Sequence, residues 1–530
     1  MDDLLLGAEA AAQGAIDAGI GGAFSYPGTP ATEIFEHVER HGRTVGIAAE
    51  WSGNEKVAFE AALGMSYVGK RALISMKHVG LNVAADPLMS SALTGVNGGL
   101  VIALGDDPGM HSSQNEQDSR YYAQFAHIPC FEPADPQEAY DLTREAFDVS
   151  ERFNVPVMVR LVTRLAHSSS VVRRRPPQPP PARPKRGDWH HWTLLPPNAR
   201  ARFGKLLETQ PALMEFTAGH RCNRLVKRGP TGVITTGVAR NYFAEAAGDQ
   251  HDFTVLSLGA YPVAPSQVNE LVSHCQQIIV LEEGYPLIER QLIGFLGVPH
   301  KQVRGRLSGA VPSQGELTVD LVRAALGQKR GNGHAAVTSL PLRQPQLCSG
   351  CPHCDSYRAI VDAVGDGENH YFFGDIGCYS LAALPPYRGI DTCVEMGASI
   401  GMAIGAARAG AHPVIATIGD STFIHSGLTS LLEAATDDLN MTVVILDNAL
   451  VAMTGGQRVF ATGDDLARII LGLGVKPERL VRLEPLARRH DEQVELFRRE
   501  INHRGLSVIL ASRPCIHAKR RSAARTGAEA

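Results

Sequence analysis

The chain has 530 residues, of which 44% are hydrophobic and 20% charged, and its formal net charge is -4. This composition is typical of a globular protein and leaves room for about three domains. The small net charge and the short basic runs give no reason to expect a nucleic acid as a partner. The chain begins Met1-Asp2-Asp3, without a basic leader, a long apolar stretch or a membrane anchor, so we expect a soluble, cytoplasmic protein.

Apolar runs at 72–76, 99–104 and 155–161 predict buried strands that alternate with helical patterns, which indicates a parallel α/β domain. The segment 170–188 that follows is rich in Pro and Arg. We expect it to form neither a helix nor an apolar core, and we interpret it as an extended linker.

Two more α/β units are predicted after the linker. Runs at 232–236, 253–258 and 277–283 predict the strands of a smaller unit. A third unit, with strands at 414–418 and 441–446, resembles the first closely enough in pattern to be a candidate for the same fold. We therefore divide the chain into four segments: 1–170, a linker and connecting segment 171–228, 229–328 and 329–530.

Gly419-Asp420-Ser421 and Asn448 are predicted to follow the two strands of the third unit. Open α/β sheets bind ligands at the carboxyl ends of their strands. One carboxylate and one amide oxygen, completed by phosphate oxygens, suit Mg²⁺. The motif therefore indicates a metal-bridged diphosphate, although two ordinary turns between strand and helix would also explain it.

Nine cysteines are present, and four of them crowd together, namely Cys348, Cys351, Cys354 and Cys378. In a reducing compartment such crowding argues for metal binding. The pair Cys348 and Cys351 alone fits a zinc site, a redox disulfide or an iron-sulfur cluster. A four-cysteine zinc site usually brings a second such pair, and none is present outside this one loop, so we favour a cluster and keep zinc as the main alternative.

The other cysteines are assigned by the same reasoning. A Pro-Cys dipeptide near the end of the third unit supplies Cys515 as a further thiolate, and Cys354 is a rival ligand. The remaining four are predicted to be small buried apolar residues: Cys130, Cys222, Cys275 and Cys393.

Glu55 precedes a run with helical spacing whose packing face is formed by Ala58, Ala61, Ala62 and Met65. The acid therefore lies near the start of a helix with a small-residue face. The helix dipole alone favours an acid there, so this position has a purely structural explanation as well as a functional one.

Taken together, these residues resemble the thiamine-diphosphate-dependent 2-oxoacid:ferredoxin oxidoreductases, and most closely the large subunits of the indolepyruvate type. Five segments carry the resemblance: Tyr26–Pro30, Met76–Pro87, Cys348–His353, Gly374–Cys378 and Met453–Gln457. It implies a pyrimidine-binding domain at 1–170, a transketolase C-terminal-like domain at 229–328, and a pyrophosphate-binding domain with iron-sulfur cysteines at 329–530.

The resemblance also implies roles for single residues. Glu55, ahead of Gly64 in its helix, would be the acid that protonates the aminopyrimidine ring of thiamine diphosphate. Mg²⁺ would be held by Asp420, Asn448 and the backbone carbonyl of Leu450. The implied ligands of a [4Fe-4S] cluster are Cys348, Cys351, Cys378 and Cys515. Other cofactor contacts would come from Gly377, Cys378, Gly419 and Ser421, and the residues expected around the substrate are Thr29, Lys77 and His78.

The implied reaction is the oxidative decarboxylation of an arylpyruvate such as indolepyruvate, with coenzyme A as acyl acceptor and ferredoxin as electron acceptor. Large subunits of this type usually continue into a ferredoxin-like domain with two further clusters. The present sequence ends soon after the basic run 519–521. We therefore expect electrons to leave through a small, beta-type subunit or directly to a soluble acceptor.

Two other functions remain open at this point. A non-redox thiamine-diphosphate-dependent decarboxylase or carboligase needs Glu55, Asp420 and Asn448 but no cysteines. A regulatory or assembly subunit would keep the fold without turnover, although the intact acids argue against it.

Overall fold

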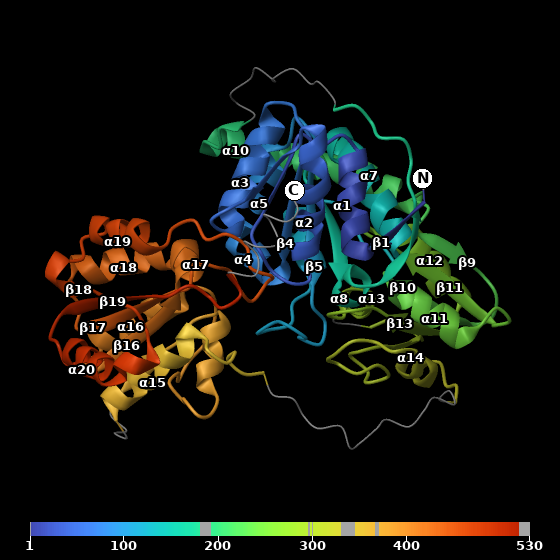
Figure 1. Cartoon of the computed structure of the whole chain (residues 1–530). Coiled ribbons are helices and arrows are strands. Elements are labelled where there is room, and N and C mark those ends of the chain that lie inside the picture. The colour runs from blue at the N-terminus through green and yellow to red at the C-terminus, as the bar shows by residue number, and fades with distance from the viewer. Residues whose placement is uncertain are drawn as a thin grey trace. The chain divides into compact units, whose positions relative to one another are not determined.

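Buried strands alternate with helices along the chain, as its apolar runs predict (Figure 1). The computed structural model describes residues 2–180, 192–294, 297–298, 300–329, 345–365 and 370–518. These residues belong to two compact units, Met1–Ala336 and Val337–Ala530. The domain boundaries given above stay predictions.

The first unit contains a seven-stranded sheet in the order β12-β6-β7-β5-β4-β2-β3. Its strands are β2 (Gly22–Ser25), β3 (Ala48–Trp51), β4 (Ala72–Lys77), β5 (Leu100–Asp106), β6 (Cys130–Phe131), β7 (Val157–Val162) and β12 (Ala260–Tyr261). Neighbouring strands run parallel, except that β12 is antiparallel to β6. Every residue of β4, β5 and β7 is buried, because both faces of the sheet are covered.

Helices cover both faces of this sheet. Figure 1 shows α1 (Gly7–Asp17), α2 (Thr32–Gly42) and α7 (Pro136–Phe153) on one face and α3 (Glu55–Tyr67) and α5 (Ala85–Thr94) on the other. Three shorter helices lie in the connections: α4 (His78–Val83), α6 (Arg120–Ala126) and α8 (Thr163–Ala166). Asn54 caps α3 and Asp135 caps α7, since each side chain accepts a hydrogen bond from the backbone N–H three residues further on.

A second, five-stranded sheet in the same unit has the order β14-β13-β10-β11-β9. Its strands are β9 (Arg224–Val226), β10 (Thr231–Thr236), β11 (Phe253–Leu258), β13 (Gln277–Leu281) and β14 (Gln302–Arg304). Its helices are α11 (Ala239–Ala247), α12 (Pro265–His274), α13 (Leu287–Ile293) and α14 (Val319–Ala325). Strand β12 follows β11 in sequence but joins the first sheet, so the two sheets share a strand connection.

Part of the predicted linker is fixed to the first unit. Strand β8 (Ser169–Arg173) pairs antiparallel with β1 (Asp2–Leu6), and the guanidinium group of Arg174 forms ion pairs with Asp3 and Asp17. Val172 is fully buried, so the expectation that this segment buries no apolar surface is wrong at this residue, because strand pairing places its side chain against the core. Residues 181–191 lie outside the described part, and the connecting segment then forms α10 (Pro196–Ala218).

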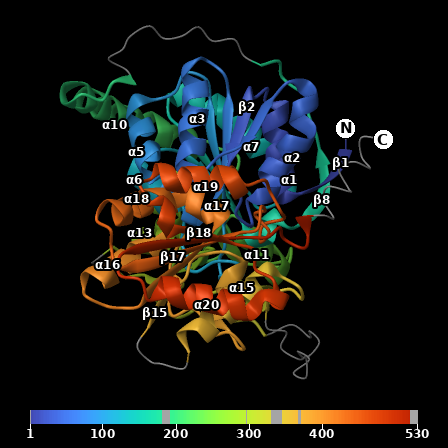
Figure 2. The same ribbon diagram turned by 60° about the vertical axis from the view of Figure 1, so that its left-hand side comes forward.

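The second unit is a five-stranded, wholly parallel sheet in the order β15-β16-β17-β19-β18. Its strands are β15 (Tyr371–Phe373), β16 (Val414–Gly419), β17 (Met441–Asp447), β18 (Leu480–Leu483) and β19 (Leu506–Ser512). Figure 2 shows α17 (Asp420–Thr422), α18 (Leu428–Thr436) and α19 (Gly463–Gly472) on one face and α15 (Pro352–Val364) and α20 (His490–Ile501) on the other. Helix α16 (Ala398–Arg408) packs with the first group.

The two larger sheets share one strand order. Numbered along the chain, β15-β16-β17-β19-β18 has the order 1-2-3-5-4, and β2-β4-β5-β7-β6 has the same order with all neighbours parallel. The first sheet adds β3 and β12 at its two edges. This agreement confirms that the first and third α/β regions have the same fold.

The predicted fold class is confirmed: the chain consists of α/β regions built on parallel sheets. Each of the eight strands predicted from an apolar run overlaps an observed strand, namely β4, β5, β7, β10, β11, β13, β16 and β17. None of the helices in the described ranges has both the length and the apolar character needed to cross a bilayer.

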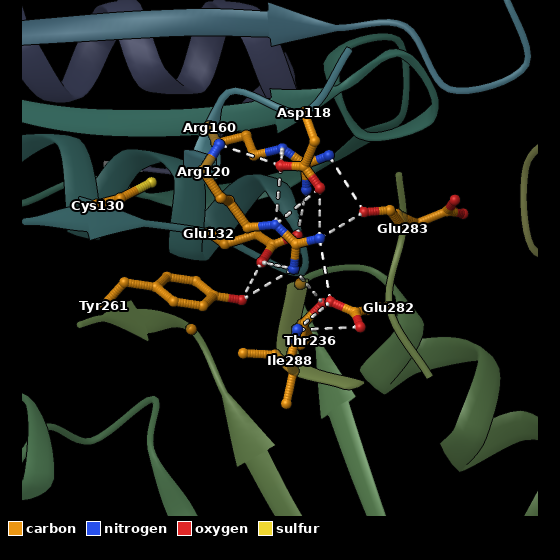
Figure 3. Close-up of polar contacts among 12 residues, drawn as sticks. Asp118, Arg120, Cys130, Glu132, Arg160, Thr236, Tyr261, Glu282, Glu283 and Ile288 are labelled. Carbon is orange, nitrogen blue, oxygen red and sulfur yellow. Dashed lines mark hydrogen bonds and ion pairs between the residues drawn. The ribbon is translucent and has the colours of Figure 1, made fainter. Parts of the chain in front are cut away.

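A buried network of charges joins the two sheets of the first unit (Figure 3). Arg160 on β7 contacts Asp106 at 2.6 Å and Glu132 at 2.5 Å, while Arg120 on α6 contacts Asp118 at 2.5 Å. The second sheet contributes Glu282, whose carboxylate lies 3.2 Å from Arg120. All these side chains are at most 3% exposed, so each charge depends on its partners rather than on water.

The carboxyl groups of this network outnumber its guanidinium groups. Glu283 lies beside Arg306, and the network then contains the five acids Asp106, Asp118, Glu132, Glu282 and Glu283 against Arg120, Arg160 and Arg306. Burial raises the pKa of Glu282 and of Glu283 to about 7, while neighbouring arginines and backbone N–H groups lower it. The phenol of Tyr261 donates to Glu132 at 2.6 Å. This neutral donor satisfies one of the carboxylates that outnumber the guanidinium groups.

Replacing Arg160 with Met should lower the free energy of unfolding of the first unit by about 3–5 kcal/mol, because Asp106 and Glu132 would stay buried without their partner. Arg173, which is 85% exposed and 3.9 Å from Asp2, provides the matched control, and Arg173→Met should cost less than about 1 kcal/mol. Urea unfolding followed by circular dichroism measures both. Equal stability of the two variants would contradict the assigned role of the network.

Candidate active site

Five predicted site residues, together with Asp107, which was not predicted, lie in turns that follow equivalent strands of the two matching sheets. In the order of the first three strands, the residues are Thr29, His78 and Asp107 in the first unit and Gly377, Asp420 and Asn448 in the second. The carboxyl ends of parallel strands meet at one edge of a sheet, where open α/β folds bind ligands. Each unit therefore carries one set of polar residues at this edge.

Glu55 is the first residue of α3 and is 5% exposed. It packs against the backbone of α4: a Cβ atom placed on Gly80 would lie only 2.4 Å from Glu55 Oε1. The carboxylate thus occupies space that any side chain at position 80 would fill. The sequence identified Glu55 but gave no reason to select Gly80, because the contact joins helices that strand β4 separates in the chain.

Lys77 and Thr29 meet through Ser112. The Lys77 ammonium donates to the Ser112 carbonyl at 2.6 Å and to its hydroxyl at 3.2 Å, and that hydroxyl donates to the Thr29 carbonyl at 3.3 Å. Asp107 accepts from the Ser112 N–H at 2.8 Å. Burial lowers the pKa of Lys77 to about 8, while the charge of Asp107 raises it. Ser112 and Asp107 were not predicted, although Asp107 directly follows β5, which overlaps the predicted strand 99–104.

His78 begins α4 and is 1% exposed. Its Nε2 lies 3.2 Å from the Asn115 carbonyl, which can only accept, so Nε2 carries the hydrogen in this contact. In the neutral ring Nδ1 is then an acceptor, and among the described residues it has no hydrogen-bond partner. This buried nitrogen is available to accept a proton or a hydrogen bond from a ligand.

Asp420 lies at the start of α17 in the second unit and is 3% exposed. Its carboxylate accepts from the N–H groups of Ser421 at 2.7 Å, Ala449 at 2.8 Å and Asn448 at 3.2 Å. Burial raises the pKa of Asp420 to about 8, and the nearby carboxyl of Asp447 raises it further. A cation at this carboxylate would favour its ionised form.

Asn448 and Leu450 form the turn after β17, next to Asp420. The Asn448 side-chain oxygen accepts from the Leu450 N–H at 3.0 Å. Its amide nitrogen lies 3.1 Å from His353 Nε2. The structure therefore brings together Asp420, Asn448 and Leu450, the three residues expected around a cation.

Tyr379 packs against two of the predicted glycines. A Cβ atom on Gly377 would lie 2.3 Å from the tyrosine ring, and one on Gly419 would lie 2.7 Å from it. The Tyr379 hydroxyl donates to the Ile376 carbonyl at 3.1 Å. Sequence reasoning selected Gly377 and Gly419 but missed the aromatic ring that both turns accommodate.

The four predicted cluster cysteines come from three segments that converge. Burial raises the pKa of Cys351 to about 12, and the thiols of Cys354, Cys348 and Cys515 raise it further. Burial also raises the pKa of Cys378, as do the thiols of Cys515 and Cys348. The thiols of Cys348 and Cys515 thus lie near both Cys351 and Cys378.

Cys354 and Cys393 are arranged differently. Cys354 directs its thiol to the Cys348 carbonyl at 3.7 Å. Its charge raises the pKa of Cys351, whereas Cys354 is not among the groups that shift the pKa of Cys378. Cys393 was expected to be buried, but it is exposed because it lies in an irregular segment, where its thiol faces the Asp375 carbonyl at 3.5 Å. Burial of the other three is confirmed: Cys130, Cys222 and Cys275.

One family model matches part of each compact unit. Residues 13–193 match the thiamine-diphosphate-binding model of pyruvate flavodoxin/ferredoxin oxidoreductases, and residues 375–510 match the C-terminal binding domain of thiamine pyrophosphate enzymes. The fold and the site thus define a thiamine-diphosphate-dependent enzyme of the 2-oxoacid oxidoreductase class.

Curated relatives are similar over nearly the whole chain. Indolepyruvate oxidoreductase subunit IorA of Archaeoglobus fulgidus is 37% identical over 96% of this chain and 86% of the relative. The subunit IorA of Methanothermobacter thermautotrophicus is 36% identical over 97% of this chain and 86% of the relative. The chain therefore belongs to the IorA family of thiamine-diphosphate-dependent 2-oxoacid:ferredoxin oxidoreductases.

A solved structure has a similar fold. It is the 2-oxoglutarate:ferredoxin oxidoreductase of Magnetococcus marinus with 2-oxoglutarate, coenzyme A and succinyl-CoA bound. The match covers 62% of this chain and 65% of that one, with a TM-score of 0.52 and 16% sequence identity. At this identity the likeness concerns the fold alone.

Gly80→Ala should lower the thiamine-diphosphate-dependent oxidation of a 2-oxoacid at least about 100-fold, because the added methyl group displaces the Glu55 carboxylate. The assay follows reduction of an artificial electron acceptor by the assembled enzyme. Gly204→Ala in α10 is the matched control, since no atom lies within 4 Å of the added Cβ, and its activity should match the wild type. Activity above half of the wild-type value in Gly80→Ala would rule out the steric role of Gly80.

Proposed function

We propose that the protein oxidatively decarboxylates an arylpyruvate, with indolepyruvate as the model substrate, and transfers the acyl group to coenzyme A. The observation that carries the proposal is the 37% identity to a named indolepyruvate oxidoreductase subunit over 96% of the chain. The balanced reaction converts the 2-oxoacid, coenzyme A and two oxidised ferredoxins into acyl-CoA, CO₂, a proton and two reduced ferredoxins. A small subunit of the same enzyme completes the proposed hetero-oligomer, and the cytoplasmic location stays a prediction.

Thiamine diphosphate would supply the electron sink for decarboxylation, and this chain would bind and orient it. Glu55, buried at the start of α3, is the proposed proton donor to the aminopyrimidine ring. Asp420 and Asn448, with the Leu450 carbonyl, would hold Mg²⁺ at the diphosphate. The raised pKa of Asp420, about 8, supports this role, because a cation offsets the cost of burying that carboxylate.

The thiols of Cys348, Cys351, Cys378 and Cys515 are the proposed ligands of a [4Fe-4S] cluster. A zinc ion needs all its sulfur ligands within about 2.3 Å of one point. In the described part of the chain, no group of three or more His, Cys, Asp or Glu residues is arranged to hold a metal ion. The preference for a cluster over zinc rests on the cysteine spacing, because no further Cys-x-x-Cys pair lies outside the loop of Cys348 to Cys354.

Lys77, His78 and Thr29 are the proposed substrate residues. Two of the three hydrogens of the Lys77 ammonium are directed to Ser112, and the third can reach a carboxylate. Because its ring nitrogen Nδ1 is an acceptor, His78 suits a hydroxyl or amino group of the bound ligand better than a carboxylate. In this proposal Lys77 binds the carboxylate of the substrate, and His78 accepts a proton or a hydrogen bond.

The anaerobically purified protein should contain about four irons and four acid-labile sulfides per chain, together with thiamine diphosphate. Cys378→Ser should lose most of the iron and the reduction of the acceptor but keep thiamine diphosphate. Cys393→Ser, which changes an exposed cysteine outside the proposed ligand set, should keep all three and serves as the control. If acceptor reduction survives in Cys378→Ser without iron, a cluster at these cysteines is not the route of the electrons. If the wild-type protein decarboxylates the 2-oxoacid without reducing any acceptor, the non-redox decarboxylase becomes the better proposal.

The value of kcat/KM for the 2-oxoacid should fall as pH rises through about 8, because Lys77 is charged below its pKa and neutral above it. The expected decrease is about tenfold per pH unit above that point. Lys77→Met should lower kcat/KM at neutral pH and remove this limb of the profile. A wild-type profile that stays flat between pH 7 and pH 9.5 would exclude Lys77 as the partner of the carboxylate.

A further inference from the structure

His353 is a buried residue between the cysteine loop and the proposed cation site. It is the second residue of α15, two positions after Cys351, and it is 3% exposed. Its Nε2 lies 3.1 Å from the amide nitrogen of Asn448. The predicted function gives no role to this histidine, although it belongs to the Cys-Pro-His motif.

The contact fixes which way the Asn448 amide faces. The Asn448 amide nitrogen can only donate, so His353 Nε2 must accept. On the other side of the amide, the Asn448 oxygen accepts from the Leu450 N–H at 3.0 Å. Turning the amide over would place its NH₂ group against the Leu450 N–H, two donors facing each other. The two contacts therefore select the orientation that keeps the oxygen on the side of Leu450.

His353 also contacts the residue that supports the glycine turns. Its ring meets the Tyr379 ring edge to face, with centroids 5.8 Å apart and planes 73° apart. Tyr379 in turn packs on Gly377 and Gly419. His353 thus contacts Asn448 after β17 directly, and through Tyr379 it is connected to Gly377 after β15 and Gly419 at the end of β16.

Backbone contacts tie the same turn to the last cysteine. The Cys515 N–H donates to the Asn448 carbonyl at 2.9 Å, and the Arg513 N–H donates to the Asp447 carbonyl at 3.0 Å. The Arg513 guanidinium donates to the Gly350 carbonyl at 2.8 Å and to Asp355 at 2.6 Å. The first and last cysteine segments therefore both reach Asn448, the first through His353 and the last through the backbone.

We propose that His353 is a positioning residue that holds the Asn448 amide with its oxygen toward the diphosphate-bound cation and couples the cysteine loop to that site. The proposal rests on the proposed function, in which Asn448 is a ligand of Mg²⁺. It predicts that removing the acceptor at position 353 weakens the use of Mg²⁺ while the cluster cysteines keep their iron.

The test compares His353→Phe, which keeps a ring against Tyr379 but has no acceptor, with His353→Gln, which keeps an acceptor oxygen. Isothermal titration of thiamine diphosphate into the cofactor-depleted protein at a series of Mg²⁺ concentrations gives the concentration for half-maximal binding. His353→Phe should raise this concentration at least about tenfold, as expected for a buried donor left unpaired, and His353→Gln should stay within about threefold of wild type. Iron per chain and the unfolding temperature should change little in both.

Any other result of the titration contradicts a particular part of the proposal. If wild-type protein binds thiamine diphosphate without Mg²⁺, the proposed cation site fails, and this inference fails with it. If wild-type protein depends on Mg²⁺ but His353→Phe shows the same dependence, only the role of His353 fails. Loss of iron without a change in Mg²⁺ dependence would make His353 a part of the cysteine loop alone. If His353→Phe does not fold, His353→Met replaces it with the same expected shift.

Discussion

Parallel strand pairing is the constraint on which the candidate site residues of each unit depend. In each unit the strands run in the order 1-2-3-5-4, so the turns after the first, second and third strands meet at one edge. Lys77 ends β4 and Asp420 directly follows β16, the equivalent second strands, while Asp107 and Asn448 directly follow the equivalent third strands β5 and β17. The same backbone geometry therefore presents an ammonium group and an acid in one unit and an acid and an amide in the other.

Buried acids in this chain fall into two kinds, which differ in whether a guanidinium group or only backbone N–H groups neutralise the carboxylate. Asp106 and Asp118 lie in the network of Figure 3 within 2.6 Å of guanidinium groups, so their charges are paired inside the protein. Asp420 receives three backbone N–H groups and has another carboxyl, that of Asp447, as its neighbour. A folded protein keeps such an acid at a cost, and the cost is offset when a cation binds. The network joins the sheets of the first unit, whereas Asp420 is a proposed cation ligand.

The sequence predicted the strands and the residues that directly follow them, because long apolar runs mark buried strands and polar residues at their ends stand out. It did not predict Ser112, Tyr379 or the contact of Gly80 with Glu55, since these depend on loops and helices that are distant along the chain. The prediction that Cys393 is buried was wrong for a similar reason. Residue type favours burial of a lone cysteine, but Cys393 lies in an irregular segment that leaves it exposed. The expectation for 170–188 was wrong at Val172 because pairing with β1 cannot be read from local composition.

The position of Asn448 decides how the chemistry of the second unit is organised. Its carbonyl accepts from the N–H of Cys515, its amide donates to His353 beside Cys351, and its own N–H donates to Asp420. A shift of either cysteine segment therefore has to move the turn that carries the proposed cation ligand. These hydrogen bonds join the backbone at Cys515 and the ring of His353 to the same turn. The two cysteine segments and the turn after β17 are therefore built as one connected group of contacts.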